Sequence, residues 1–508
     1  MGDYTKQVKR CWDYTEGVIL SSMEIKRVYM KQLIAKLTLA FVIISVLVLP
    51  TEYSSAHESE RTYVNIGIAF GSSAVSNATV SSDEGFKIIR VVSEQFHELL
   101  RVPDTRQLDV SIESGEIIVR NSFGEMIPVN FDVDTVIVPI NFEDGGIITI
   151  NNRQYRGGIR FFPVSGGRMN VINFVELEHY IAGVLHAEIG QGSPIEVIKA
   201  QAVATRSFTI TNLGRHRNEG FDLCNSWHCQ VYRGYADEFP STLRATNETA
   251  GLVIKHGGVP VQAFYFANSG GHTQSSQDVW GGTLPHTVGV RDDFSPHLPW
   301  TYQITFTALG TRLAAAGHNV GTVQSVAITE RAVSGAATEV EIRGSERTVQ
   351  LRGERFRLAL GASNVRSQMF SFDGATSQMP PAGATSPSFV ISNGTTNRQI
   401  NSGDTVHVMG ANGVVVQRNA SDIYITSYTL TPRRGETQQN GTSQQDNRET
   451  GNQNNLDVVT DGLLVIHGTG FGHGVGMAQQ SAIEMARRGY NLTQILTFFY
   501  TDITVERL

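Results

Sequence analysis

The stretch that most constrains the fold runs from residue 174 to residue 212, where two helical patterns meet at a short break rich in glycine. It reads FVELEHYIAGVLHAEIGQGSPIEVIKAQAVATRSFTITN, and apolar residues recur at helical spacing on both sides of the break. Ser193 is the predicted N-cap of the second helix, with Pro194 in the first helical position and Glu196 completing a capping box. The pattern predicts two helices that pack together on a sheet.

A carboxyl group and two basic groups flank this break. Glu188 ends the first helix, where the helix dipole disfavours a carboxylate and raises its pKa, which suits a general acid. Lys199 and Arg206 share a face of the second helix, and Gln201 lies on the same polar side. By position alone, Glu188 also fits an ordinary surface residue. The basic pair is either a solvated stripe or a clamp for a polar substrate beside Glu188.

Four metal-ligand side chains follow the second helix with the spacing H-x7-C-x3-H-C: His216, Cys224, His228 and Cys229. Two cysteines and two histidines satisfy the tetrahedral coordination of zinc, and four protein ligands would make a closed, structural site. A disulfide between Cys224 and Cys229 is the alternative in an exported protein. The spacing alone favours neither interpretation.

The beginning of the chain predicts export. Basic residues precede an apolar run at 37–49, and Ser54 and Ala56 fit cleavage after Ala56. The run is shorter than the roughly 20 residues of a membrane span, so we expect a cleaved signal peptide, with an uncleaved anchor as the alternative. The body of the protein is therefore expected outside the cell or at the cell wall. A net charge of −7 without a basic tract in the body argues against a nucleic-acid partner.

The predicted fold class is α+β, with one domain interrupted by an insertion. A β-rich region is expected to contain one helix, at 86–100, where apolar residues recur at helical spacing. The insertion has linker-like flanks around a strand-rich centre, 389–429. The expected segments are a leader and signal (1–56), the β-rich region (62–152), the main domain (153–373 and 457–508) and the insertion (374–456).

Five segments together carry a family resemblance, and they occur in the family's order. They read VELEHYIAGVLHAEIG, IEVIKAQAVATRSF, FYFANSGGHTQSSQDVWGGTLPHTVGV, LRGERFRLALGASNVRSQMF and GTGFGHGVGMAQQSAIEMARRGYNLTQILTFFY. The chain resembles the SpoIID/LytB domain, named for the sporulation protein SpoIID and for LytB, an amidase enhancer.

The resemblance implies a lytic transglycosylase that cleaves peptidoglycan glycan strands stripped of stem peptides. The family's single acting glutamate corresponds to Glu188, and its lysine and arginine correspond to Lys199 and Arg206. Some members hold zinc with a Cys/His cluster here, which favours zinc over the disulfide. LytB-type members imply the alternative, a non-catalytic wall-binding protein that activates a cell-wall amidase. A zinc hydrolase at the cluster is a third hypothesis, which needs an open coordination position.

A lone carboxyl group fits the transglycosylase chemistry. Glycoside hydrolysis normally uses two carboxyl groups, and no second one has an equal claim in this sequence. A transglycosylase needs one, which protonates the leaving oxygen and then takes the proton of the muramyl C6 hydroxyl to close a 1,6-anhydro ring. The expected sugar groove is lined by two polar loops. They contribute Ser269, His473, which is expected to be exposed between two glycines, and Gln479.

Overall fold

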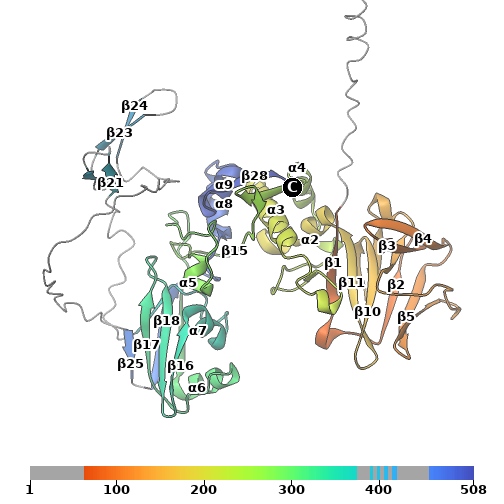
Figure 1. Ribbon diagram of the computed structural model, residues 1–508, viewed down its shortest axis with the longest axis horizontal. Helices are drawn as coiled ribbons and strands as arrows, with labels where there is room; N and C mark the ends of the chain where they lie inside the picture. Colours follow the sequence, from red (N-terminus) through yellow and green to blue (C-terminus); the bar gives the residue numbers. More distant parts are fainter. Residues whose placement is uncertain are drawn as a thin grey trace, which may run out of the picture. The chain divides into compact units, whose positions relative to one another are not determined.

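The computed structural model describes residues 62–373, 389–392, 397–400, 405–409, 415–419, 457–460 and 462–508. The predicted signal segment at 37–49 lies outside these residues. Within the described ranges, every helix is too short or too polar to cross a membrane. Sheets and helices are mixed along the chain, which confirms the α+β class (Figure 1).

A seven-stranded sheet, in the order β12-β1-β11-β10-β7-β3-β4, organises the first part of the described chain. Its strands are Leu223–Cys224, Tyr63–Ala69, Arg168–Glu176, Gly158–Val164, Thr135–Pro139, Phe86–Val92 and Gln95–Val102. A five-stranded sheet, in the order β6-β5-β2-β8-β9, shares its buried core. Those strands are Glu116–Asn121, Gln107–Glu113, Asn77–Ser81, Ile147–Ile150 and Arg153–Arg156. Because β1 pairs with both β11 and β12, the larger sheet spans the expected boundary at residue 152.

The helix predicted at 86–100 was wrong, since this segment forms the hairpin β3–β4. Phe86 and Ile88 enter the main core, while Ile89 packs on the opposite face of the sheet. A strand buried on both faces has consecutive apolar residues, which helical spacing also permits. The turn is made by Ser93 and Glu94 with φ of 48° and 65°. Neither residue is a typical signal for such a turn.

The predicted pair of helices is present, as α2 (Leu177–Ile189) and α3 (Ile195–Thr211). Helix α3 packs against α2 and against three other helices: α4 (Pro240–Glu248), α8 (Gln479–Arg487) and α9 (Leu492–Phe499). Smaller sheets join β13 (Leu252–His256) to β14 (Val259–Pro260) and β28 (Thr504–Arg507), and β15 (Tyr265–Phe266) to β27 (Met477–Ala478). Helices α8 and α9, near the end of the chain, thus pack against α3.

The predicted capping box was wrong. Pro194 is the N-cap of α3, and the helix begins at Ile195. The Ser193 hydroxyl donates instead to the Ile189 carbonyl at 2.7 Å, so Ser193 satisfies the end of α2. The Glu196 carboxylate accepts from the backbone N–H of Leu492 at 2.9 Å and therefore ties α3 to α9.

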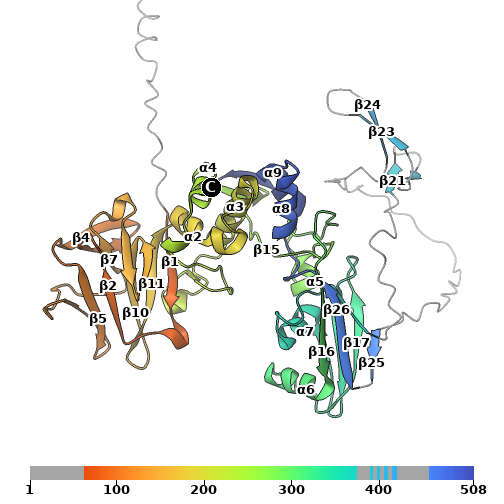
Figure 2. The ribbon, with the colours of Figure 1, turned by 180° about the vertical axis from the view of Figure 1, so that it is seen from behind.

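A second core lies among residues 300–372 and 459–466. Its sheets are β16-β26-β20 and β19-β18-β17-β25, accompanied by helices α6 and α7 (Figure 2). These elements are Pro299–Thr305, Leu463–Thr469, Phe370–Phe372, Thr348–Arg352, Ala337–Gly344, Val323–Arg331, Asp457–Val459, Phe306–Ala315 and Gly353–Leu360. Strands on both sides of the expected insertion thus pair with one another.

Two hairpins are described within the insertion. Strand β21 (Phe389–Ser392) pairs with β22 (Asn397–Ile400), and β23 (Thr405–Met409) pairs with β24 (Val415–Asn419). These strands fall in the segment 389–429, where the alternating pattern predicted them.

Replacing Gly67 with alanine is expected to destabilise the protein by about 1 to 3 kcal/mol. Gly67 of β1 faces Cys224 of β12, and a Cβ there would lie 2.6 Å from the ring of Phe221. Urea unfolding measures the loss. Gly282→Ala is the control, since a Cβ at Gly282 meets no atom within 4 Å. Equal unfolding free energies for the two variants would contradict the predicted overlap.

Candidate active site and metal cluster

Glu188 lies in the last turn of α2, partly buried. Its Oε1 accepts a hydrogen bond from the backbone N–H of Val231 at 3.3 Å, and the side chain of Gln479 also hydrogen bonds to it. Burial raises the pKa of Glu188 above its ordinary value, against the opposing effect of these two hydrogen bonds. The direction is the one expected from the sequence, although burial rather than the helix dipole is the main cause.

Gln479 connects Glu188 to the interior of α3. Its Nε2 donates to Oε1 of Gln201 at 3.4 Å, and Nε2 of Gln201 donates to Oγ1 of Thr205 at 3.2 Å. Gln201 is fully buried, so its hydrogen bond holds the amide of Gln479 against the core. The structure therefore brings together three residues that the sequence suggested separately, with Gln479 as the link between the other two.

Gln230 and Tyr265, two neutral side chains that the sequence analysis missed, form a tyrosine network with Tyr180. Gln230 accepts from the hydroxyl of Tyr180 at 3.0 Å, and its Nε2 donates to the hydroxyl of Tyr265 at 3.0 Å. Burial, together with the nearby carboxylate of Glu188, raises the pKa of both tyrosines well above the usual value. Position could have pointed to Gln230, which directly follows Cys229, and to Tyr265, which lies in a family-like segment.

The two basic residues make ion pairs with other acidic residues. Arg206 is fully buried, and its guanidinium donates to both carboxylate oxygens of Glu178 and to the carbonyl of Leu252. Lys199 pairs with Glu196 at 3.0 Å and with Glu248 at 2.5 Å. The solvated basic stripe, one of the two interpretations of this pair, is thus not formed, since Arg206 is fully buried and the Lys199 side chain is only 16% exposed. Arg206 joins α2 to β13, and Lys199 joins α3 to α4.

Replacing Arg206 with methionine is expected to cost about 2 to 4 kcal/mol of unfolding free energy, because Glu178 would lose its partner. The value is below that of a fully buried pair, since the Glu178 side chain is 24% exposed. Urea unfolding measures it, with Arg244→Met as the surface control, expected within about 0.5 kcal/mol of the parent. An unchanged unfolding curve with lost glycan binding would instead make Arg206 a substrate residue.

Ser269 is buried, and His473 is half-buried. The hydroxyl of Ser269, which is 3% exposed, donates to Asp292 at 2.6 Å. The same oxygen of Asp292 accepts from Ser481 on α8, so Ser269 fastens its loop to that helix. The expectation that His473 is exposed was wrong: its ring lies among Phe264, Phe266 and Trp280. Burial lowers the pKa of His473 to about 4, which leaves the imidazole neutral at neutral pH.

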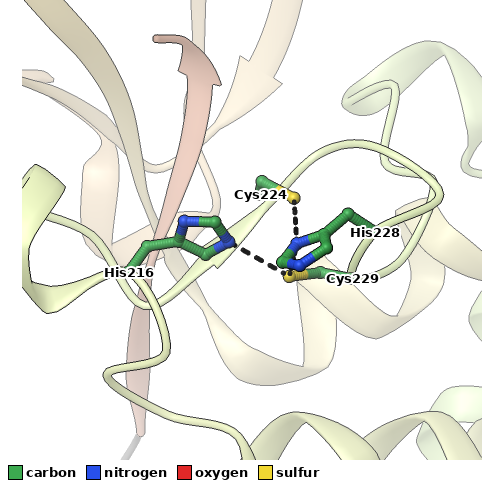
Figure 3. A group of neighbouring side chains, drawn as sticks. All are labelled: His216, Cys224, His228 and Cys229. Atoms are coloured by element: carbon green, nitrogen blue, oxygen red, sulfur yellow. Dashed lines mark hydrogen bonds between the residues drawn. The ribbon is translucent and has the colours of Figure 1, made fainter. Parts of the chain in front are cut away.

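The four Cys/His residues converge on one point (Figure 3). Their ligand atoms all lie within 4.8 Å of one another, and both cysteines are free thiols, so the alternative disulfide is not formed. Sγ of Cys229 lies 3.5 Å from Nε2 of His216 and 3.6 Å from Nδ1 of His228. A tetrahedron with zinc–ligand bonds of 2.0 to 2.3 Å has edges of roughly 3.3 to 3.8 Å. The group therefore fits a tetrahedral ion.

Neighbouring residues orient the ligands. Nδ1 of His216 contacts the carboxylate of Glu219 at 2.6 Å, which directs Nε2 toward the cluster, as in carboxylate–histidine–metal arrangements. The ring of Phe221 stacks on His216 at 4.8 Å. Hydrogen bonding between the thiols lowers the pKa of Cys224 and raises that of Cys229, so the pair holds one thiolate readily. The cluster has the donor set and support of a structural metal site.

The residues that directly follow Cys229 link the Cys/His cluster to Glu188. Gln230 and Val231 follow Cys229 directly, and they supply, respectively, the centre of the tyrosine network and the backbone donor to Glu188. The loop that carries Cys224, His228 and Cys229 therefore sets the position of both Gln230 and Val231.

Comparison with known proteins places this region in a family. Residues 165–256, which include Glu188, Gln201 and the Cys/His cluster, match the profile SpoIID, described as "Stage II sporulation protein". The chain contains a SpoIID domain. Gln479 lies outside the matched SpoIID segment, although it completes the hydrogen bonding of Glu188.

Curated relatives of the SpoIID domain match parts of the chain. An uncharacterized protein of Brachyspira hyodysenteriae is 30% identical over 224 residues, 44% of this chain and 60% of the relative. The amidase enhancer of Bacillus subtilis is 25% identical over 207 residues, 40% of this chain and 27% of the relative. Stage II sporulation protein D of the same species is 25% identical over 162 residues, 29% of this chain and 47% of the relative. The chain is thus distantly homologous to the amidase enhancer and to stage II sporulation protein D. Its matches span less than two thirds of each of the three relatives.

Proposed function

We propose that this protein is exported and acts on peptidoglycan as a lytic transglycosylase, cleaving glycan strands that lack stem peptides. The observation that carries the proposal is Glu188, a partly buried carboxyl group with a raised pKa, held by two uncharged donors within a SpoIID domain. A raised pKa keeps more of the carboxyl protonated near neutral pH, as a general acid requires.

One carboxyl group completes the proposed reaction. Glu188 gives its proton to the glycosidic oxygen as the bond from that oxygen to C1 of the muramyl sugar breaks. The carboxylate then takes the proton of the C6 hydroxyl while O6 bonds to C1, closing the 1,6-anhydro ring. Between the steps, the Val231 N–H and Gln479 stabilise the carboxylate. No water is consumed, and Glu188 ends protonated.

The Cys/His cluster is proposed to hold zinc in a structural role. His216, Cys224, His228 and Cys229 would supply four ligands, which leave no open position for a hydrolytic water. The ion would fix the loop that carries Gln230 and Val231. This assignment disfavours the third hypothesis, a zinc hydrolase.

The test incubates the purified protein with glycan strands freed of stem peptides, followed by mass spectrometry. The expected products carry 1,6-anhydromuramyl ends, lighter by one water than the ends left by hydrolysis. Reducing muramyl ends would identify a hydrolase and overturn the proposed mechanism.

An amidase enhancer is the second candidate, favoured by the similarity to the Bacillus subtilis protein of that name. In this case the chain would bind the wall and stimulate a cell-wall amidase, and Glu188 would serve only the fold. Stimulation of an added amidase by the parent and by Glu188→Gln alike, without anhydro ends, would replace the first proposal with this one.

The pH dependence of kcat/KM is expected to reflect the raised pKa of Glu188. Since the free enzyme must carry the proton, activity should fall as pH rises through this pKa, at a higher pH than for an ordinary glutamate. Gln479→Met removes a hydrogen bond that lowers the pKa, so the fall should move to still higher pH. A pH–rate profile of anhydro-end formation measures both. A fall that moves to lower pH in Gln479→Met would contradict this role of Gln479.

A further inference from the structure

The two thiols of the Cys/His cluster differ in how they are held. Cys224 belongs to β12, where it pairs with Gly67 of β1, and it is 1% exposed. Cys229 lies partly exposed on a turn, with its side chain directed inward toward the other ligands. The backbone N–H of Cys229 donates to the carbonyl of Ser226 at 3.0 Å, and Trp227 in the same turn is 85% exposed. One sulfur is therefore fixed in the sheet, and the other belongs to a surface turn.

A short movement of this turn would bring the two sulfurs within bonding distance. The ligand atoms of the cluster lie within 4.8 Å of one another, and a disulfide needs sulfurs about 2.0 Å apart. Because Cys224 is held in the sheet, most of the approach falls on the turn that carries Cys229. Nδ1 of His228 lies 3.6 Å from each sulfur, and this residue is exposed, so solvent reaches the group from the side of His228.

A disulfide would remove two of the four ligands of a bound metal ion. Thiolates, rather than disulfide sulfurs, are metal ligands, so only the imidazoles of His216 and His228 would remain. Two ligands do not complete a tetrahedral site. The formation of a disulfide and the binding of the ion therefore exclude each other.

The displaced turn leads directly to the carboxyl group of Glu188. Gln230 and Val231 follow Cys229 in the chain, and the Val231 N–H donates to Oε1 of Glu188 at 3.3 Å, at the long end of hydrogen-bond distances. A shift of about 1 Å at Val231 would break this bond, and a misplacement of this size in an active site can cost about 100-fold in rate.

We propose that Cys224 and Cys229 form an oxidative switch, in which a peroxide converts the metal-bound thiolates into a disulfide and the cluster releases the ion. The Cys229 thiolate attacks one peroxide oxygen, the O–O bond breaks, and hydroxide leaves behind a sulfenic acid. The Cys224 thiolate then attacks this sulfur and displaces a second hydroxide. Two electrons pass from the sulfurs to the peroxide, solvent protons convert both hydroxides to water, and the charge of the ion is unchanged. The effect on glycan cleavage rests on the proposed function, whereas the oxidation does not.

Hydrogen peroxide added to the reduced, zinc-loaded full chain tests the oxidation. A chromogenic chelator should detect one zinc released per chain as two thiols are lost. Trypsin cleaves after Arg217 and Arg233, so both cysteines fall in the peptide 218–233, which should become lighter by two hydrogens. A thiol reductant with added zinc should reverse both changes, unlike methionine oxidation. Retention of zinc and both thiols, or conversion to sulfinic and sulfonic acids alone, overturns the proposal.

Variants that keep the metal separate the disulfide from general oxidative damage. Cys229→His and Cys229→Asp each supply another type of zinc ligand but cannot form the disulfide. Whichever of the two binds zinc should retain it under the same peroxide treatment. Ser226→Ala is the matched control, since it keeps both cysteines and should release zinc as the parent does. Release from the Cys229 variant as fast as from the parent would contradict the switch, and the mass of the peptide 218–233 tests it in the parent alone.

Formation of 1,6-anhydromuramyl ends tests the link to Glu188. The oxidised chain should form these ends about 100-fold more slowly, and reductant with zinc should restore the rate. Release of zinc and a lighter peptide with unchanged cleavage would overturn the link. No cleavage by the reduced chain would refute the proposed function instead, while the zinc and peptide measurements would still decide the oxidation.

Discussion

Replacing Glu188 with glutamine is expected to reduce the formation of 1,6-anhydromuramyl ends about 100- to 10,000-fold, the usual contribution of a general acid. The amide keeps the shape and can still accept from the Val231 N–H, but it cannot transfer a proton in either step. Initial rates by mass spectrometry measure the loss, and pull-down with glycan strands tests whether binding is retained.

Glu484→Gln is the matched control for this variant. Glu484 lies on α8 and pairs with Arg488 at 2.9 Å on the surface, so its replacement should leave the rate and the melting temperature unchanged. Full activity in Glu188→Gln would show that the chain cleaves by another group. Equal losses in both variants, with lower melting temperatures, would point to the fold instead.

Removal of the metal is expected to have the second large effect. A ligand present at a thousand times its Kd stabilises the folded state by about 4 kcal/mol, and structural zinc is commonly bound at least that tightly. Chelation should therefore lower the melting temperature, and it should abolish activity because Gln230 and Val231 lose their support. Elemental analysis of the purified chain should give one zinc per chain.

Thiol counting under denaturing conditions separates the metal from a disulfide. Zinc-bound cysteines react fully once the chain is unfolded with a chelator, whereas a disulfide between Cys224 and Cys229 would leave both unreactive. Cys224→Ser should lose the metal, while Ser226→Ala, in the same loop but outside the ligand set, should retain it. Two unreactive cysteines together with no bound zinc would contradict the metal assignment.

The helical pair and the side chains gathered around it could be predicted from the sequence because their signals are local. Helix α2 ends at the break, where Gly190 has φ of 78°. The four Cys/His residues lie within one short segment. Gln201 and Gln479 could be suggested only by position and family resemblance. Their hydrogen bond joins residues 278 positions apart, a contact that no periodicity encodes.

Three of the errors have a common physical cause, since burial changed what each pattern indicates. At 86–100, a strand that is buried on both faces has apolar residues at the spacing of a helix. The solvated stripe, one of two interpretations of Lys199 and Arg206, assumed that α3 has a solvated side, but α3 packs against four other helices and Arg206 is buried in an ion pair with Glu178. Glycines around His473 suggested an exposed turn, although the imidazole is half-buried against Phe266 and Trp280. Each of these three mistakes concerns tertiary packing, which is absent from a local pattern.

The hydrogen bond between Gln479 and Gln201 has a consequence for the timing of activity. Glu188 is synthesised long before Gln479, its side-chain partner, which lies on α8 near the end of the chain. A chain that ends before α8 therefore lacks the amide that hydrogen bonds to Glu188. The proposed activity of Glu188 is thereby linked to completion of the polypeptide.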